Sequence, residues 1–262
     1  MPRIHNHQMS FSNNLYQIYR CSSWYERISR LRGTPYAKAM DCDREFFGLF
    51  FKSNAIRKVF DVGANVGDKA DIFSEFADRV ICVEADPRTA TGLKSRFAFR
   101  KRVIVENVAI GAEVGSATLF RKNHSGFNTL SKKWSNAAGD QGVSDAGAVD
   151  VAVTTLDRLI GKHGIPDFIK IDVEGFELPA ICGLSRPIKA LSFEANVPTF
   201  LDETKAIIGK LSELQPNMRF SLRIMEARTF HLPKFVDGGT LITKLADLSP
   251  FTCDIFAVDS NT

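Results

Sequence analysis

The sequence lacks any apolar run near the roughly 18 residues that a helix needs to cross a bilayer. Its opening stretch, MPRIHNHQMSFSNN, is polar and has no apolar centre, so we expect no signal peptide. Only five cysteines are present, widely spaced and without a C-x-x-C pair, which argues against a disulfide scaffold or a cysteine zinc site. We therefore expect reduced thiols and a cytoplasmic protein.

A general excess of positive charge is also missing. The net charge is +4, but residues 1–60 hold ten Lys or Arg against four Asp or Glu, and the rest of the chain is slightly acidic. We therefore expect no nucleic-acid partner. The basic segment predicts an amphipathic helix over residues 15–31, which we expect to pack on the domain rather than dock on an anionic membrane. The basic run RFAFRKR at 96–102 is interpreted as a solvated helix end.

What is present is the composition of a globular protein, with 44% hydrophobic and 24% charged residues. We predict a tail and helical extension over residues 1–54, including a helix at 43–52, and one domain over 55–262. In that domain, continuous apolar segments alternate with helical patterns, which is typical of strands buried on both faces of a doubly wound, mostly parallel α/β sheet. The main segments are KVFDV, RVICV, VIVEN, DFIKI, KALSFEA, MRFSLRIM and CDIFAVDS. The polar stretch 123–148 predicts a long loop, and 227–245 is left unassigned.

A glycine turn follows the first of these strands. Asp61 ends the strand, and Gly63 and Gly67 flank a turn that leads into a helix from Asp68. Glycine allows close approach of a ligand, and the helix N-terminus points at it. Glu84 ends the next strand, 23 residues after Asp61, where a carboxylate can accept both hydroxyls of a ribose. Together these residues predict a site for a nucleoside-bearing cofactor.

The spacing of the turn discriminates between cofactors. Asn65 occupies the place of the central glycine of the G-x-G-x-x-G fingerprint, where a side chain obstructs a pyrophosphate. The carboxylate of Asp61 would repel a pyrophosphate and would suit a cationic ligand, such as the amino group of S-adenosylmethionine. No G-K-[ST] sequence follows, which excludes a P-loop.

Five strings, in this order and spacing, resemble the FkbM-type S-adenosylmethionine-dependent methyltransferases. They are FDVGANVGD at 60–68, VEADP at 83–87, NVAIG at 107–111, TTLDRLI at 154–160 and DFIKIDVEGFE at 167–177. The resemblance covers about residues 58–195. It implies a class I methyltransferase (Rossmann-like) fold, a seven-stranded sheet whose last strand is antiparallel, S-adenosylmethionine as cofactor, and O-methylation of hydroxyls on sugars or macrolide natural products.

The resemblance also implies roles for particular residues. The methionine end of the cofactor would lie against Asp61, Gly63, Asn65 and Gly67. The ribose would lie against Glu84, with Ala85 beside it, and the adenine against Asn107, Val108 and Ala109. The methyl group would lie above Asp172. The acceptor would be a small molecule or a glycan that offers a hydroxyl.

Two carboxylates, Asp172 and Glu174, follow the fourth buried strand, at the edge where ligands bind in open α/β sheets. Methyl transfer to an alcohol is helped by positioning and by a base that removes the hydroxyl proton. We assign positioning to Asp172 and the base to Glu174. His124, in the polar stretch, is an alternative base.

Further side chains are candidates for contacts with the acceptor. Glu194 and Asn196 end the fifth strand at the same edge, and Trp134 lies in the polar stretch, where it either stacks on a sugar or anchors a lid. No spacing predicts a metal site of three or four ligands.

Two other functions are carried as alternatives. One is an NAD-dependent dehydrogenase or epimerase, which Asn65 and the lack of any tyrosine after Tyr36 disfavour. The other is a Rossmann-like domain that binds a cofactor or a partner without turnover, which the carboxylates on three strands disfavour.

Overall fold

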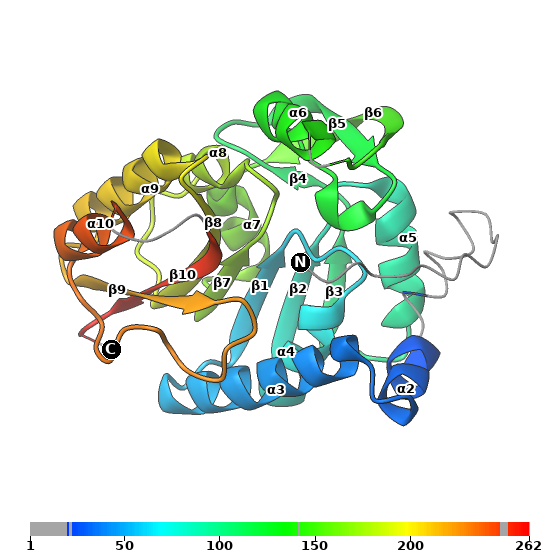
Figure 1. The fold of residues 1–262 in the computed structure, drawn as a ribbon, viewed down its shortest axis with the longest axis horizontal. Helices are drawn as coiled ribbons and strands as arrows, with labels where there is room; N and C mark the ends of the chain where they lie inside the picture. The colour runs from blue at the N-terminus through cyan, green and yellow to red at the C-terminus, as the bar shows by residue number, and fades with distance from the viewer. Residues whose placement is uncertain (1–19, 21–22, 141, 247–250, 262) are drawn as a thin grey trace.

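A seven-stranded sheet lies at the centre of the computed structural model, which describes residues 20, 23–140, 142–246 and 251–261 (Figure 1). The strand order is β3-β2-β1-β7-β8-β10-β9. The bounds are β1 Lys58–Val62, β2 Arg79–Val83, β3 Val103–Glu106, β7 Phe168–Ile171, β8 Ala190–Val197, β9 Met218–Ile224 and β10 Phe251–Asp259. The pairs from β3 to β8 are parallel, and β10 is antiparallel to both neighbours. The predicted α/β fold with an antiparallel last strand is confirmed.

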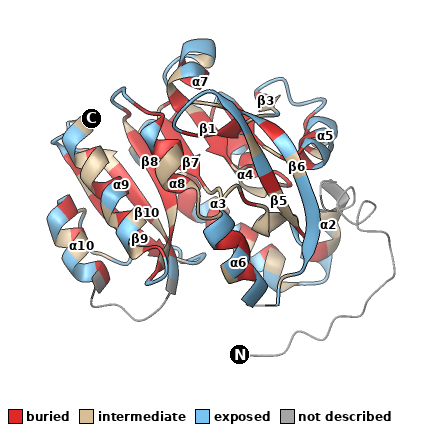
Figure 2. Ribbon diagram, turned by 90° about the horizontal axis from the view of Figure 1, so that it is seen from above, coloured by how far each residue is buried: buried red, intermediate tan, exposed pale blue. Residues whose placement is uncertain are grey.

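Helices cover both faces of this sheet. One face carries α3 Pro35–Ser53, α4 Asp68–Phe76 and α5 Pro87–Arg96, and the other carries α7 Leu156–His163, α8 Glu177–Cys182, α9 Leu201–Leu214 and α10 Gly238–Ala246. Alternate strand residues face the two layers, so that Val59 packs toward α3 and α4 while Phe60 packs toward α7 and α8. The strands are consequently the most buried part of the chain (Figure 2).

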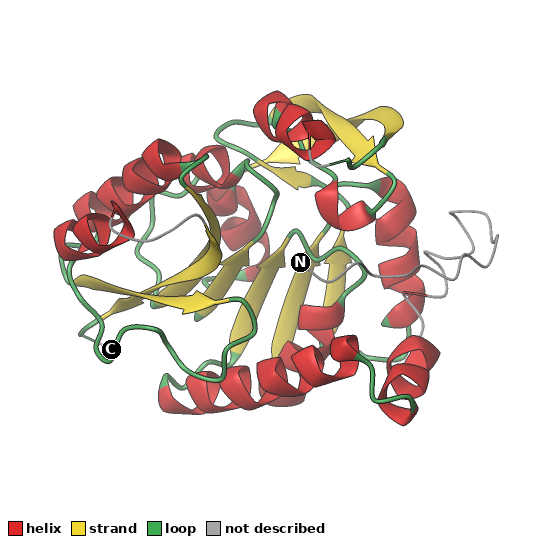
Figure 3. Cartoon of the chain, in the orientation of Figure 1, coloured by secondary structure: helices red, strands yellow, loops and turns green. Residues whose placement is uncertain are grey.

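A small second sheet lies over the carboxyl ends of the central strands (Figure 3). It consists of β4 Ala109–Ile110, β5 Gly115–Lys122 and β6 Asp145–Thr154, with the 3-10 helix η1 Ser125–Phe127 and α6 Lys132–Asp140 between β5 and β6. The predicted loop over 123–148 is therefore wrong, because this stretch holds η1, α6 and the start of β6. Trp134 and Ala138 lie one helical turn apart and are both buried, which gives α6 an apolar side that the polar composition concealed.

The N-terminal helices pack on the domain. Helix α2 Ser23–Leu31 contacts α3 through the edge-to-face rings of Tyr25 and Tyr36, whose centroids are 5.0 Å apart. Helix α3 begins well before the predicted position 43, because Thr34 caps it by accepting a hydrogen bond from the Ala37 amide. Its buried phenylalanines, Phe46, Phe47, Phe50 and Phe51, join the core.

Two predicted segments lie wholly or partly outside the described residues. The tail at 1–12 and most of the first half of the helix at 15–31 lie outside them. Among the residues that are described, no helix combines the length and apolar character that a membrane span requires.

Candidate active site

The turn after β1 holds its shape through left-handed backbone conformations at Gly63, Asn65 and Gly67, with φ of 83°, 47° and 89°. A Cβ on Gly63 would overlap the backbone oxygen of Asp172, so the turn approaches the end of β7 closely. Gly67 begins α4 and packs on α5, away from the cavity described below. Thus Gly63 and Asn65 border the site, and Gly67 supports the turn.

Glu84 joins this turn to the one after β2. One carboxylate oxygen accepts a hydrogen bond from the Asn65 amide and the other from the Asp86 amide, both at 2.8 Å. The side chain is buried, and burial raises the pKa of Glu84 to about 7 although the two hydrogen bonds oppose the shift. Each oxygen keeps a free lone pair for a ligand hydroxyl.

A cavity of about 130 Å³ lies between these turns, β4 and the small sheet. Eight of the predicted site residues line it: Gly63, Asn65, Glu84, Ala85, Val108, Ala109, Asp172 and Glu174. Asp61, Gly67 and Asn107 do not. Asn107 instead donates its side-chain amide to the backbone oxygens of Glu84 and Ala85, at 2.8 and 3.1 Å, and so holds the turn after β2.

The small sheet closes the cavity through contacts that the sequence did not indicate. Asp86 caps α5 and receives Arg121 of β5 through two hydrogen bonds, at 2.9 and 2.6 Å. Asn128 also donates to Asp86, at 3.2 Å, and the Ser125 hydroxyl donates to the Asn65 side chain at 2.7 Å. An Asp-Pro pair signals a helix cap, but its pairing with β5 left no signal in the sequence.

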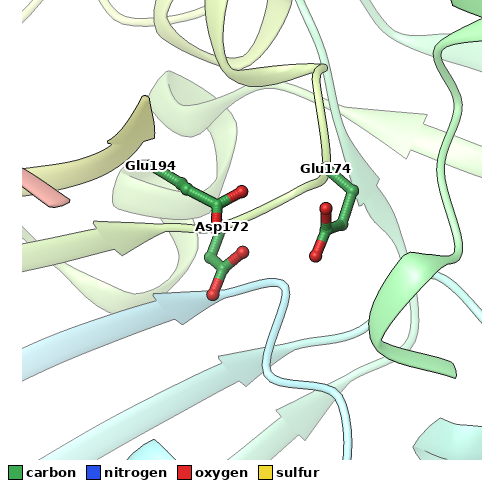
Figure 4. Close-up of side chains that lie close together, drawn as sticks. All are labelled: Asp172, Glu174 and Glu194. Atoms are coloured by element: carbon green, nitrogen blue, oxygen red, sulfur yellow. The ribbon is translucent and has the colours of Figure 1, made fainter. Parts of the chain in front are cut away.

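Three carboxylates, Asp172, Glu174 and Glu194, converge beside the cavity, with oxygen atoms within 4.8 Å of one another (Figure 4). Glu174 has a left-handed backbone with φ of 53°. Its turn is fixed by Glu177, which accepts from the amides of Val173 and Gly175 at 3.0 and 3.3 Å. Burial and the neighbouring carboxylates raise the pKa of both Glu174 and Glu194 well above the ordinary value. Such a cluster favours a cation.

Lys170 is a buried partner of these groups that sequence reasoning missed. Its ammonium lies 2.6 Å from the Asp172 carboxylate. Burial opposes its charge, but Asp172, Asp61 and Asp254 outweigh burial and hold the pKa of Lys170 above its ordinary value. Asp61 is 1% exposed, neither of its carboxylate oxygens has a hydrogen-bond partner among the described residues, and burial raises its pKa to about 6. Among the buried groups around Lys170, carboxylates therefore outnumber cations.

A second cavity of about 380 Å³ adjoins the carboxylates on the side of α6 and α9. Its lining includes Glu194 and Asn196, the two strand residues for which acceptor contacts were predicted, together with Lys133, Phe200 and Glu203.

The other two predicted side chains lie elsewhere. Trp134 lies on the buried side of α6, with its ring centroid 5.6 Å from that of Phe200. It lines neither cavity, so its role is to anchor the helix. His124 is exposed and also lines neither cavity.

Comparison with protein-family models gives a match over most of the chain. The family described as Methyltransferase FkbM domain matches residues 61–245. No curated protein matches the sequence.

Solved structures with a similar fold include several methyltransferases. An O-methyltransferase from Bacillus cereus in complex with SAH is 14% identical, with 97% of this chain and 94% of that chain covered and a TM-score of 0.46. A putative O-methyltransferase from Klebsiella pneumoniae is 10% identical, with 92% and 98% covered and a TM-score of 0.44. Aeropyrum pernix fibrillarin with natively bound S-adenosyl-L-methionine is 12% identical, with 78% and 66% covered and a TM-score of 0.41. Likenesses at these scores carry no conclusion about the substrate.

Proposed function

The chain belongs to the FkbM methyltransferase family, and from that premise we propose that it methylates a hydroxyl group of a sugar, a glycoside or a related natural product. S-adenosylmethionine is its cofactor, and when bound it supplies an electrophilic methyl group on a positively charged sulfur. The family match removes the NAD-dependent alternative.

The residues of the first cavity fit that cofactor. Asp61 is buried with both carboxylate oxygens unpartnered among the described residues. Lys170 is the nearest cation to Asp61, Asp172 and Asp254, and Lys69 acts more weakly on Asp61 and Asp254. An excess of buried negative charge is costly unless a cation compensates it, and the cofactor is cationic. Glu84 has lone pairs for the ribose hydroxyls. The apolar residues Ala85, Val108 and Ala109 would hold the adenine.

The observation that carries the proposal is the position of Glu174 between the two cavities. Glu174 lines the first cavity, and its carboxylate lies within 4.8 Å of that of Glu194, which lines the second. A hydroxyl held in the second cavity is therefore within reach of a base beside the first. An alcohol has a pKa far above neutrality, so removal of its proton during attack assists transfer. The raised pKa of Glu174 makes it a stronger base than an ordinary carboxylate.

The second cavity has the chemistry of a polyhydroxylated acceptor. Glu194, Asn196 and Glu203 offer hydrogen-bond acceptors, and Asn196 also offers donors. Phe200 adds an aromatic surface, with the ammonium of Lys133 4.3 Å from its centroid. Convergent polar groups around an aromatic face favour an oriented sugar over a purely apolar acceptor.

Methyl transfer from labelled S-adenosylmethionine to a panel of sugars, glycosides and macrolides, followed by mass spectrometry, tests the proposal. We expect Glu174→Gln to lower kcat about 10²- to 10⁴-fold while the affinity for S-adenosylhomocysteine, which lacks the sulfonium charge, stays within a few-fold. Glu213→Gln, at an exposed position of α9, is the matched control and should be fully active. Transfer to amines or thiols but to no alcohol would refute the proposal, as would full activity of Glu174→Gln.

A further inference from the structure

The edge of the sheet opposite the active site exposes a row of apolar side chains. Phe76, Phe99 and Ile165 lie a few residues before β2, β3 and β7, with exposed fractions of 39%, 99% and 57%. Leu49 is 61% exposed on α3, next to Gly48, where an added Cβ would meet the Phe76 ring at 2.9 Å. The strands β3, β2, β1 and β7 are neighbours in that order, and adjacent strands lie about 4.8 Å apart. Figure 1 shows the starts of β1, β2 and β3 at the end of the sheet away from the small sheet. The four side chains therefore share one edge.

Exposed cations lie among these apolar residues. Lys52, Arg79, Lys101 and Arg186 precede or begin strands at the same edge. Within the described ranges, their side chains form no hydrogen bond or ion pair. We call these four cations and the four apolar residues the amino edge.

The acidic residues at the amino edge are already engaged. Asp78 forms an ion pair with Arg57 at 2.7 Å, and Asp167 accepts the backbone amides of Arg57 and Lys58, both at 2.8 Å. The amino edge is thus positive, whereas the active-site edge holds the surplus carboxylates.

An apolar cavity opens at this same edge, between the end of α3 and the outer strands. Its volume is about 620 Å³, and Leu49 lines it. The other apolar walls come from Phe46, Phe50, Phe230, Phe235 and Val258, and Arg219 and Arg228 also line it. Aromatic walls with guanidinium groups match a hydrocarbon chain that carries an anionic head group.

We propose that the amino edge docks on the surface of an anionic phospholipid membrane. Separate apolar side chains between cations are suited to an interface, where each ring or branched chain enters the head-group region and the cations meet lipid phosphates. Single-stranded nucleic acid stacks on aromatic faces, which Phe76 and Phe99 offer but Leu49 and Ile165 do not, so the row is not a continuous stacking surface. Docking in this orientation leaves the active site facing away from the bilayer, open to acceptors in solution.

Vesicle flotation of the full chain tests the proposal independently of methyl transfer. We compare phosphatidylglycerol–phosphatidylcholine vesicles with pure phosphatidylcholine at low and high salt. The first variant is Phe99→Ser, and the second combines Lys52→Gln, Arg79→Gln and Lys101→Gln. The matched controls are Arg88→Gln and Val114→Ser, both exposed and remote from the amino edge.

We expect binding to the anionic vesicles only, weakened by salt, by roughly fivefold for each cation removed and by about tenfold or more for Phe99→Ser. Both controls should bind as the native chain does, and the thermal melts of all variants should coincide. Absence of anionic-vesicle binding would overturn the proposal, as would equal losses in the controls. Tighter binding to a single-stranded oligonucleotide than to vesicles, unaffected by Phe99→Ser, would overturn it in favour of nucleic acid.

Discussion

Replacement of Glu84 by glutamine tests how the cofactor cavity is held together. The two carboxylate oxygens of Glu84 accept the amides of Asn65 and Asp86, each at 2.8 Å. Glutamine offers one acceptor oxygen, so one buried N–H group loses its partner at a cost of about 1–3 kcal/mol. The variant should therefore be less stable than the native chain at any pH where burial of the Glu84 carboxyl carries no ionisation cost.

The size of this loss depends on pH, because burial raises the pKa of Glu84 to about 7 from a model value of 4.5. Below 4.5 the carboxyl is protonated in both folded and unfolded chains, and no ionisation penalty exists. Between pH 4.5 and 7 the unfolded chain loses the Glu84 proton while the folded chain keeps it, so the fold is destabilised across this interval by on the order of 3 kcal/mol, and by no more above it. Glutamine escapes that penalty. We therefore expect Glu84→Gln to be destabilised by about 1–3 kcal/mol at pH 5 and to equal or exceed the native stability at pH 8.

Urea unfolding at pH 5 and pH 8 measures this crossover, and calorimetry measures the cofactor. Loss of a charged acceptor for hydroxyls costs about 1.5–3 kcal/mol, so we expect S-adenosylmethionine to bind roughly tenfold to a hundredfold more weakly at pH 8. Glu113→Gln, an exposed glutamate between β4 and β5, should change neither quantity. The same destabilisation at both pH values, or unchanged cofactor affinity, would refute the reasoning.

Two further substitutions address the buried charge and the glycine turn. Lys170→Met removes the ammonium 2.6 Å from Asp172, and we expect a loss of about 3–5 kcal/mol in urea unfolding at pH 8. Part of the loss should be recovered at pH 5, where Asp61, whose pKa is raised to about 6, takes up a proton. An equal loss at both pH values would contradict this. Gly63 and Gly142 have φ of 83° and 84°, but only a Cβ on Gly63 meets other atoms, at the backbone of Asp172. Gly142→Ala should lower the free energy of unfolding by about 1–2 kcal/mol. Gly63→Ala should lower it further and abolish cofactor binding. Equal thermal shifts for the two variants would show that the close approach to Asp172 does not require glycine at position 63.

The central sheet could be predicted because strands buried on both faces leave continuous apolar runs. The helix predicted to begin at Asp68 is α4, which begins at that residue. Helix α6 could not be predicted, because its buried residues, Trp134, Ser135 and Ala138, include a single large apolar side chain, and its other residues are polar or small. Helix α3 begins earlier than predicted because its start depends on the Thr34 cap and not on the apolar EFFGLFF segment.

The same distinction applies to the site. Gly63, Glu84 and Asp172 could be predicted, since each lies in a turn directly after a strand and the sheet brings those turns together. Lys170 and Arg121 could not, because their roles come from partners that only the fold supplies. Lys170 lies between carboxylates of neighbouring strands, and Arg121 meets a side chain 35 positions earlier in the chain.

The most direct test of the central claim is the number of protons released when S-adenosylmethionine binds, measured by calorimetry at pH 7 in buffers of different ionisation enthalpy. Burial and mutual repulsion raise the pKa of Glu174 and Glu194 well above the ordinary value, and an adjacent positive charge lowers it again. We predict release of roughly one proton with S-adenosylmethionine, and less with S-adenosylhomocysteine, which lacks the sulfonium charge. Equal release with both ligands, or none with either, would contradict the claim that these carboxylates complement a cationic methyl donor.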